Sequence, residues 1–323
     1  GLTMQIIEKI KRFKALNQQA PALLWAFAYF FLLLTAYYLL RPVRDAMGAS
    51  SNVLDVFPTV MVDWFASRGI ALGDYMLQAL FTGTFIVMLV LQPFYGALVA
   101  NFPRKTFLPF IYSLFIACLM GFYWIFDSEM PGRGALFFIW VAVFNLFAVS
   151  VFWSFMADIF TDAQAKQAYG YIAAGGTVGG FLGPIIAQSL VNIVGVAPLL
   201  LVSGSLLAVC VFCIQRLSHW ASVNKLRGIN ETDLIGGSMW AGLKLVWETP
   251  MLRALAGLMV FGVGVGTLLY NEQAAIAKIY FSTTEERTQF FSRIDLWINA
   301  LTLLIQLFFT RALLSRYGVA PLL

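Results

Sequence analysis

Long apolar runs separated by short polar segments fill most of the chain. Eight runs are long enough to cross a hydrocarbon core of about 30 Å as helices that rise about 1.5 Å per residue. These predicted spans are residues 21–46, 75–100, 107–126, 134–157, 168–194, 197–216, 251–275 and 291–312. The last residues, Gly318 to Leu323, resemble the start of a ninth span, so we expect the chain to be incomplete. The pattern predicts an all-α polytopic membrane protein.

The longest polar break, residues 217–250, follows the sixth span. Its asparagine, aspartate and glycine residues are typical of a linker, and residues 239–249 predict a short amphipathic helix. We therefore predict a six-helix bundle at 21–216, a cytoplasmic linker at 217–250 and a partial second bundle at 251–323. Two bundles joined by a linker are the layout of a secondary transporter, and no soluble catalytic domain is left over.

Two segments outside the spans also carry apolar residues at helical spacing. In residues 1–20, Ile6 and Ile10 lie among lysines and an arginine, which predicts a cytoplasmic, basic, amphipathic helix on the membrane surface. In the loop 47–74, apolar positions recur every three or four residues over 53–64, which predicts a helix lying on the outer interface.

Loop charges predict the orientation. With a cytoplasmic N-terminus, fourteen lysines and arginines fall on the cytoplasmic side and seven on the other. Cytoplasmic loops of membrane proteins carry the excess of these residues, so we expect the N-terminus in the cytoplasm and the chain in a bacterial inner membrane.

Composition excludes a soluble protein. Hydrophobic residues make up 60% of the 323 residues and charged residues 11%, whereas soluble domains average about 25% charged residues. The net charge of +5 is explained by the cytoplasmic loops, so no nucleic-acid partner is expected. Cys210 and Cys213 form a C-x-x-C inside a span without a second pair or clustered histidines, so no metal or other cofactor is expected.

Span five contains a glycine-rich stretch from Tyr169 to Pro184. Gly175/Gly179, Gly176/Gly180 and Gly179/Gly183 are small-xxx-small pairs, which let helix backbones approach closely in lipid. A phosphate-cradling loop is the alternative, but no strand precedes the stretch and no G-K-[ST] ends it. Close helix packing is therefore the prediction.

Three segments resemble known transporters. Residues 96–105, G-A-L-V-A-N-F-P-R-K, resemble the loop between spans two and three of the major facilitator superfamily. Residues 152–170, F-W-S-F-M-A-D-I-F-T-D-A-Q-A-K-Q-A-Y-G, are similar to a segment of the ATP:ADP antiporter family within that superfamily, and so is L-R-P-V-R-D at 40–45. L-L-Y-N-E-Q at 268–273 is a looser match, which places the acidic residue of that family's seventh span at Glu272.

The resemblance implies major facilitator-type helical bundles and nucleotide exchange. The family's acidic residue in span four falls near Val141, where this chain has no carboxylate, and the nearest polar group is Asn145. A shared scaffold is therefore favoured over a shared substrate.

Arg41 and Arg44 are the principal candidates for binding. Arg41 lies sixteen residues after Trp25, roughly 24 Å along a helix, which places the pair just inside the outer boundary. Positions i and i+3 share a helical face, and two guanidiniums there can bind phosphate or carboxylate. The alternative is that Arg41 pairs with Asp45 and both arginines reach the lipid headgroups.

Three further polar positions have structural as well as functional interpretations. Asn145 lines a cavity or makes an interhelical hydrogen bond, and Glu272 serves transport, pairs with an arginine or faces the outer water. Asp295 and Asn299 share a face at the start of span eight, where a structural ion pair is the default expectation.

These residues predict a secondary active transporter, not an enzyme, that moves an organic anion by alternating access. Arg41 and Arg44 would neutralise the solute, Asn145 would orient it and Glu272 would serve coupling. A proton-coupled transporter of other specificity and a non-transporting facilitator-like protein remain the alternatives. A membrane enzyme would need Asp158, Asp162 and Lys166 to converge in a closed pocket.

Overall fold

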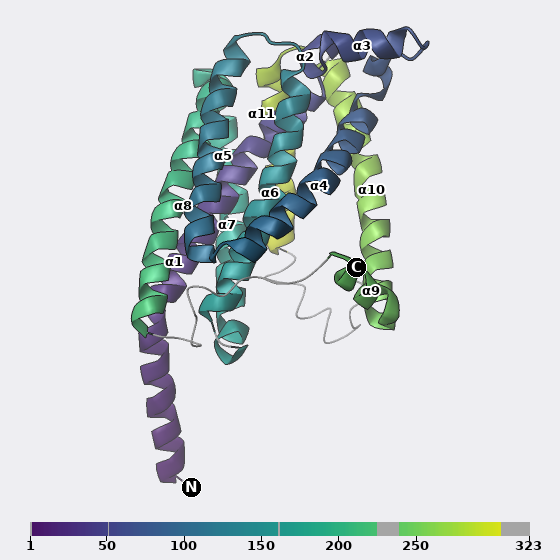
Figure 1. Ribbon diagram of the computed structural model, residues 1–323. Helices are drawn as coiled ribbons and strands as arrows, with labels where there is room; N and C mark the ends of the chain where they lie inside the picture. Colours follow the sequence, from purple (N-terminus) through teal and green to yellow (C-terminus); the bar gives the residue numbers. More distant parts are fainter. Residues whose placement is uncertain (1, 51, 161, 225–238, 305–323) are drawn as a thin grey trace.

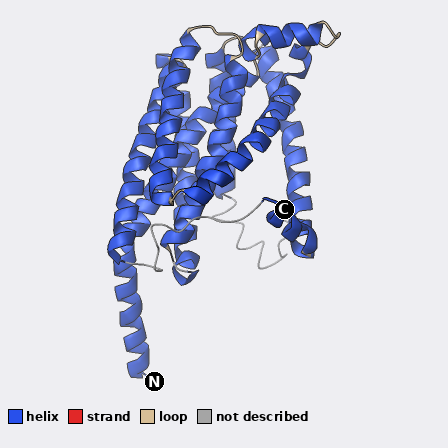
Figure 2. Cartoon of the chain, viewed as in Figure 1, coloured by secondary structure: helices blue, strands red, loops and turns tan. Residues whose placement is uncertain are grey.

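A computed structural model describes residues 2–50, 52–160, 162–224 and 239–304, and all its elements in these ranges are helical (Figure 2). The elements are α1 (Leu2–Gly48), α2 (Val53–Val56), α3 (Thr59–Ala66), η1 (Leu72–Tyr75), α4 (Met76–Asn101), α5 (Arg104–Asp127), α6 (Arg133–Ile159), α7 (Asp162–Val194), α8 (Ala197–Asn224), α9 (Met239–Glu248), α10 (Pro250–Tyr280) and α11 (Thr284–Leu304). Within the described residues, seven helices are long and apolar enough to cross a membrane.

These seven helices confirm the first seven predicted spans. Predicted span eight, residues 291–312, begins within α11, and its part after Leu304 lies outside the described residues, as does the expected start of a ninth span. Residues 225–238 of the predicted linker also lie outside them, whereas α9 confirms the short helix predicted over 239–249.

The first helix is the centre of the fold. α1 packs against α6, α7 and α8 of the first predicted bundle and against α11 of the second (Figure 1). Its buried positions include Tyr29, Leu33, Leu40 and Val43, all at most 1% exposed. Apolar side chains therefore cover α1 on several sides, which fixes the position of the charged residues near its end.

The glycines of α7 confirm the prediction of close helix packing. A Cβ added at Gly179 would lie 2.6 Å from the carbonyl oxygen of Phe31, and one at Gly183 would lie 2.6 Å from Cβ of Tyr38. Only a residue without a Cβ allows α7 and α1 to approach this closely. The alternative of a phosphate-cradling loop is wrong, because the whole stretch lies inside a continuous helix.

α2 and α3 lie at the end of the molecule that is uppermost in Figure 1, which we call the upper end; the N-terminus lies beyond the lower end. At the upper end the two predicted bundles are in contact. Helices of both contribute to one apolar cluster, the upper cluster, made of Ala46, Ala49, Val56, Phe57, Leu72, Met76, Leu77, Leu80, Phe138, Ala274, Ala277 and Phe291. Apolar packing therefore joins α1, α4 and α6 to α10 and α11 at this end.

The single helix predicted over 53–64 is two helices. Phe57 is extended, with φ −117° and ψ 150°, because the residue before a proline is disfavoured in the α conformation, and Pro58 follows it. Val56 and Phe57 are buried in the upper cluster, whereas α3 lies across the upper end and exposes Val60 and Trp64 (Figure 1).

The N-terminal segment also differs from expectation. Residues 1–20 were expected to lie on the membrane surface, but α1 runs from Leu2 through the first span as one helix with Pro21 inside it. Its first turns project past the lower ends of the neighbouring helices (Figure 1).

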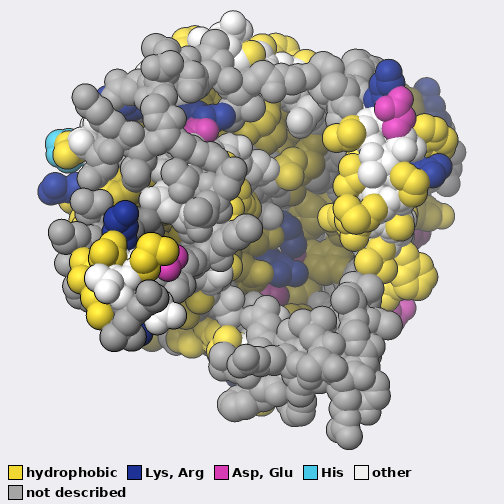
Figure 3. Space-filling model, turned by 90° about the horizontal axis from the view of Figure 1, so that it is seen from below, with side chains coloured by type: hydrophobic (Ala, Val, Ile, Leu, Met, Phe, Trp, Pro, Cys, Tyr) yellow, Lys and Arg dark blue, Asp and Glu magenta, His cyan; other side chains and the backbone are white. Residues whose placement is uncertain are grey.

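The lower end is hollowed between the helices. Figure 3, seen from below, shows a depression whose walls are largely hydrophobic and whose floor carries basic and acidic side chains. Such a charged floor deep among apolar helices needs a functional explanation, because ionisable groups at membrane depth are costly.

Candidate functional site

The candidate site is built on the upper part of α1. Pro42 lies inside the helix, and α1 continues past it to Gly48. The Arg41 side chain is 32% exposed and that of Arg44 is 14% exposed, so both are at least partly buried against the protein.

Asp45 holds Arg44. Nε and Nη2 of Arg44 donate hydrogen bonds of 2.9 and 2.8 Å to Oδ1 of Asp45, and the hydroxyl of Tyr270 donates to the same oxygen at 2.6 Å. The expected pairing of Arg41 with Asp45 is therefore not the one observed. The Asp45 carboxylate is instead occupied by Arg44 and by a tyrosine from α10.

Arg41 faces a carboxylate from α11. Its Nε lies 3.8 Å from Oδ2 of Asp295, whose side chain is 5% exposed. Both of these atoms are buried and have no hydrogen-bond partner. The expectation of an ion pair at Asp295 is confirmed. The pair links two helices far apart in the sequence, and its long separation is not accompanied by a hydrogen bond.

Aromatic rings complete the surroundings of the two guanidiniums. Cζ of Arg41 lies 5.7 Å from the centroid of the Tyr38 ring, and Cζ of Arg44 lies 5.1 Å from that of Phe138 on α6. Cation–π contacts at such distances add to the stabilisation of a desolvated cation.

These contacts define a charge cluster of Arg41, Arg44, Asp45, Tyr270 and Asp295. It joins α1 to α10 and α11, and its two cations are balanced by two carboxylates. A balanced cluster at membrane depth avoids the cost of an isolated charge, and any anion that enters must compete with a carboxylate already present.

The structure does not bring all four predicted residues together. Asn145 is half-buried and lies seven positions after Phe138, on the same face of α6. Glu272 is exposed on α10. Tyr270 contacts the cluster instead, and residues two apart on a helix do not share a face.

Sequence reasoning missed Tyr270 and gave Asp295 only a structural role. One signal for Asp295 was available, because a carboxylate inside a span is a functional candidate by default. For Tyr270 no comparable signal existed, since a tyrosine near the end of an apolar helix is common at membrane interfaces.

The residues named for the enzyme alternative are only partly described. Asp158 at the end of α6 pairs with Arg104 at the start of α5, whereas the side chains of Asp162 and Lys166 lie outside the described part. Among the described residues there is no group of three His, Cys, Asp or Glu side chains that could hold a metal ion.

One comparison with known proteins assigns the chain to a family. The family model of the Major Facilitator Superfamily matches residues 46–323, which is most of the chain. No curated protein and no solved structure matches it. The match agrees with the helical architecture and the seven described candidate spans. The chain therefore belongs to the major facilitator superfamily and is a secondary transporter embedded in a lipid bilayer.

Proposed function

We propose that this transporter moves an organic anion and that Arg41 is the cation that meets it. The main support is the difference between the two arginines of the charge cluster. Arg41 is more exposed than Arg44, and its Nε makes no hydrogen bond. A partly buried guanidinium whose Nε–H has no hydrogen-bond partner favours a carboxylate or phosphate.

Arg44 takes a supporting role in this proposal. Its two hydrogen bonds to Asp45 hold it in place, and Tyr270 fixes the acceptor from the opposite bundle. Since Arg44 lies one turn from Arg41 on the same face, it adds positive potential to the site without leaving its partner.

Asp295 is the internal competitor for Arg41. The 3.8 Å separation and the lack of a hydrogen bond make the pair weak enough for a solute anion to displace the carboxylate. Displacement would break a link between α1 and α11, so binding would act differently on the two arrangements of the bundles, as alternating access requires.

Asn145 and Glu272 enter the proposal on different grounds. Asn145 lies about two turns, roughly 10 Å, below Phe138 on the α6 face that Phe138 presents to Arg44, which supports a place on the cavity wall. The coupling role of Glu272 is supported only by the resemblance to the ATP:ADP antiporters. Tyr270 is the residue through which α10 reaches the cluster.

The resemblance implies nucleotide exchange as the first candidate, whereas the charge balance supports a proton-coupled transporter as the second. A strict exchanger must not reorient without a bound solute. Unpaired buried arginines would impose an energetic penalty on that empty reorientation and so prevent it. Here Asp295 and Asp45 pair with Arg41 and Arg44, and such internal pairing lowers that penalty. Asp295, once displaced from Arg41, is the carboxylate that would accept a proton.

We further propose that the N-terminus is cytoplasmic in a bacterial inner membrane. The two-to-one distribution of lysine and arginine supports this orientation. The hollow of Figure 3 then opens to the cytoplasm and the upper cluster closes the outer side.

Uptake into proteoliposomes tests the proposal. Labelled ATP, phosphate and a dicarboxylate are offered to vesicles with and without internal ADP. Uptake that requires internal ADP supports exchange, and uptake that requires a proton gradient supports the second candidate. Arg41→Ala should abolish uptake of the anion, whereas Arg68→Ala should not, because Arg68 lies over Trp64 beside α3. Failure to move any anion would contradict the proposal.

A further inference from the structure

The projecting part of α1 is an amphipathic surface that the transport proposal leaves unused. The first candidate span begins at Ala20, so about eighteen residues of helix, roughly 27 Å, precede it. Ile6 and Ile10 are 50% and 52% exposed there. These isoleucines are therefore uncovered apolar side chains on the part of α1 that precedes the candidate span.

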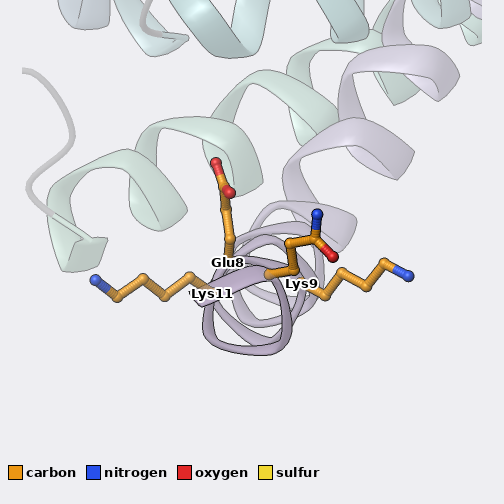
Figure 4. A pocket seen from close by; sticks show the side chains of 4 residues that line it. Glu8, Lys9 and Lys11 are labelled. Atoms are coloured by element: carbon orange, nitrogen blue, oxygen red, sulfur yellow. The ribbon is translucent and has the colours of Figure 1, made fainter. Parts of the chain in front are cut away.

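The charges are arranged around this helix in a definite way. At about 100° per residue, Ile6 and Ile10 lie on one face, and Glu8 lies opposite the midpoint between them. Lys9 and Lys11 fall about 80° and 120° to either side of that midpoint. Figure 4 shows this arrangement, with Lys9 and Lys11 extending in opposite directions and Glu8 pointing between them.

Such an arrangement suits a bilayer surface. Two lysines bordering an apolar face can reach outward to headgroup phosphates while the isoleucines enter the acyl boundary. The sequence adds Arg12 and Lys14, so residues 2–20 carry four cations and one carboxylate. This excess of positive charge is complementary to an anionic leaflet and not to a neutral one.

Pro21 supplies a place to bend. Its nitrogen cannot donate the helical hydrogen bond, so α1 is weakened at the boundary between the projecting part and the span. A bend there would lay residues 2–20 along the surface beside the point where α1 enters the bilayer.

We propose that the N-terminal helix, residues 2–20, binds anionic phospholipid headgroups of the leaflet at the lower end, with Ile6 and Ile10 inserted and Lys9 and Lys11 on phosphate. This inference is independent of the transported solute. It makes the helix an anchor whose position depends on lipid charge.

Spin-label accessibility on the full chain tests the proposal. A nitroxide at Thr3→Cys, in a Cys118→Ser background, is placed in nanodiscs of phosphatidylglycerol or phosphatidylcholine, and its collisions with oxygen and with a water-soluble nickel complex are compared. In phosphatidylglycerol the nickel collisions should fall and the oxygen collisions rise. In phosphatidylcholine the label should stay in water.

Charge variants make the test specific. Each lysine near an anionic surface changes the binding equilibrium about fivefold, so Lys9→Gln with Lys11→Gln should lower it about 25-fold. Glu8→Gln, on the opposite face, should not lower it. Three results would overturn the proposal. The label could stay in water in phosphatidylglycerol, it could be immersed equally in both lipids, or its collision rates could be the same with and without the lysine substitutions. Crosslinking of the helix to another protein segment would do the same.

Discussion

At the scale of single residues, the two arginines of α1 differ in how they are held. Arg44 has two short hydrogen bonds to Asp45, whereas Arg41 faces Asp295 at 3.8 Å without one. In our proposal this geometry separates two identical side chains: Arg44 stabilises the fold through its hydrogen bonds, and Arg41, without one to Asp295, binds the solute.

Substitution of each arginine by glutamine should therefore give opposite results. Arg44→Gln leaves Asp45 as an uncompensated buried charge, and we expect it to lower the unfolding free energy by about 3 kcal/mol. Arg41→Gln also removes the partner of a buried carboxylate, Asp295, but it breaks no hydrogen bond to it, so we expect a smaller loss of stability together with loss of anion binding. Thermal unfolding in detergent and equilibrium binding measure the two effects. Equal loss of stability in both variants would contradict this division.

Removal of the competitor should strengthen binding. In Asp295→Asn the solute no longer displaces a carboxylate from Arg41, so we expect the Kd for the anion to fall several-fold, about 1 kcal/mol in binding free energy. Asp63→Asn, an exposed aspartate on α3, serves as the control. A weaker affinity in Asp295→Asn would show that Asp295 helps to hold the solute.

At the scale of elements, the pairing of α1 with α7 positions the site. Gly179 and Gly183 bring the α7 backbone onto Phe31 and Tyr38, and Gly180 faces Asn299 of α11, whose Oδ1 lies 3.0 Å from an added Cβ. Asn299 in turn donates to the backbone oxygen of Asp295 at 2.8 Å. The glycine face therefore sets how closely α11 brings Asp295 to Arg41.

Gly179→Ala should disturb this pairing. The new methyl group would lie 2.6 Å from the Phe31 oxygen, and overpacking of this kind costs about 1–3 kcal/mol. Gly170→Ala in the same helix is the matched control, because nothing lies within 4 Å of its Cβ. The melting temperature in detergent should fall for the first variant only. An unchanged value for Gly179→Ala would show that α7 can move away from α1 without loss.

At the scale of the whole molecule, the contacts at the upper end hold the two predicted bundles together. Arg287 of α11 is 3% exposed, and its Nε donates to the carbonyl oxygen of Ala46 on α1 at 3.1 Å. Its Nη1 also donates to the carbonyl oxygens of Phe281 and Ser282. Together with Tyr270 on Asp45, this guanidinium links the bundles near the upper cluster, away from the lower end that Figure 3 shows as hollow.

Arg287→Gln should favour opening of the upper end. Loss of one cross-bundle hydrogen bond, worth about 1 kcal/mol, would raise the open population about fivefold. Labelling of Ala277→Cys, a fully buried position of the upper cluster, with a membrane-impermeant maleimide measures the opening. Arg293→Gln, an exposed arginine of the same helix, is the control. If labelling does not rise above that control, Arg287 does not help to keep the upper end closed.

The sequence by itself determined the seven described candidate spans and the close packing of the glycine face, because length, apolar content and spacing act locally along a helix. It did not determine the partners of those arginines. Asp295 lies 254 positions from Arg41 and Tyr270 lies 225 positions from Asp45, and only the packing of α10 and α11 against α1 brings them together. The rotation of α10 about its own axis decided which of its residues reaches the cluster. It places Tyr270 on Asp45, and it leaves Glu272, two positions later, exposed.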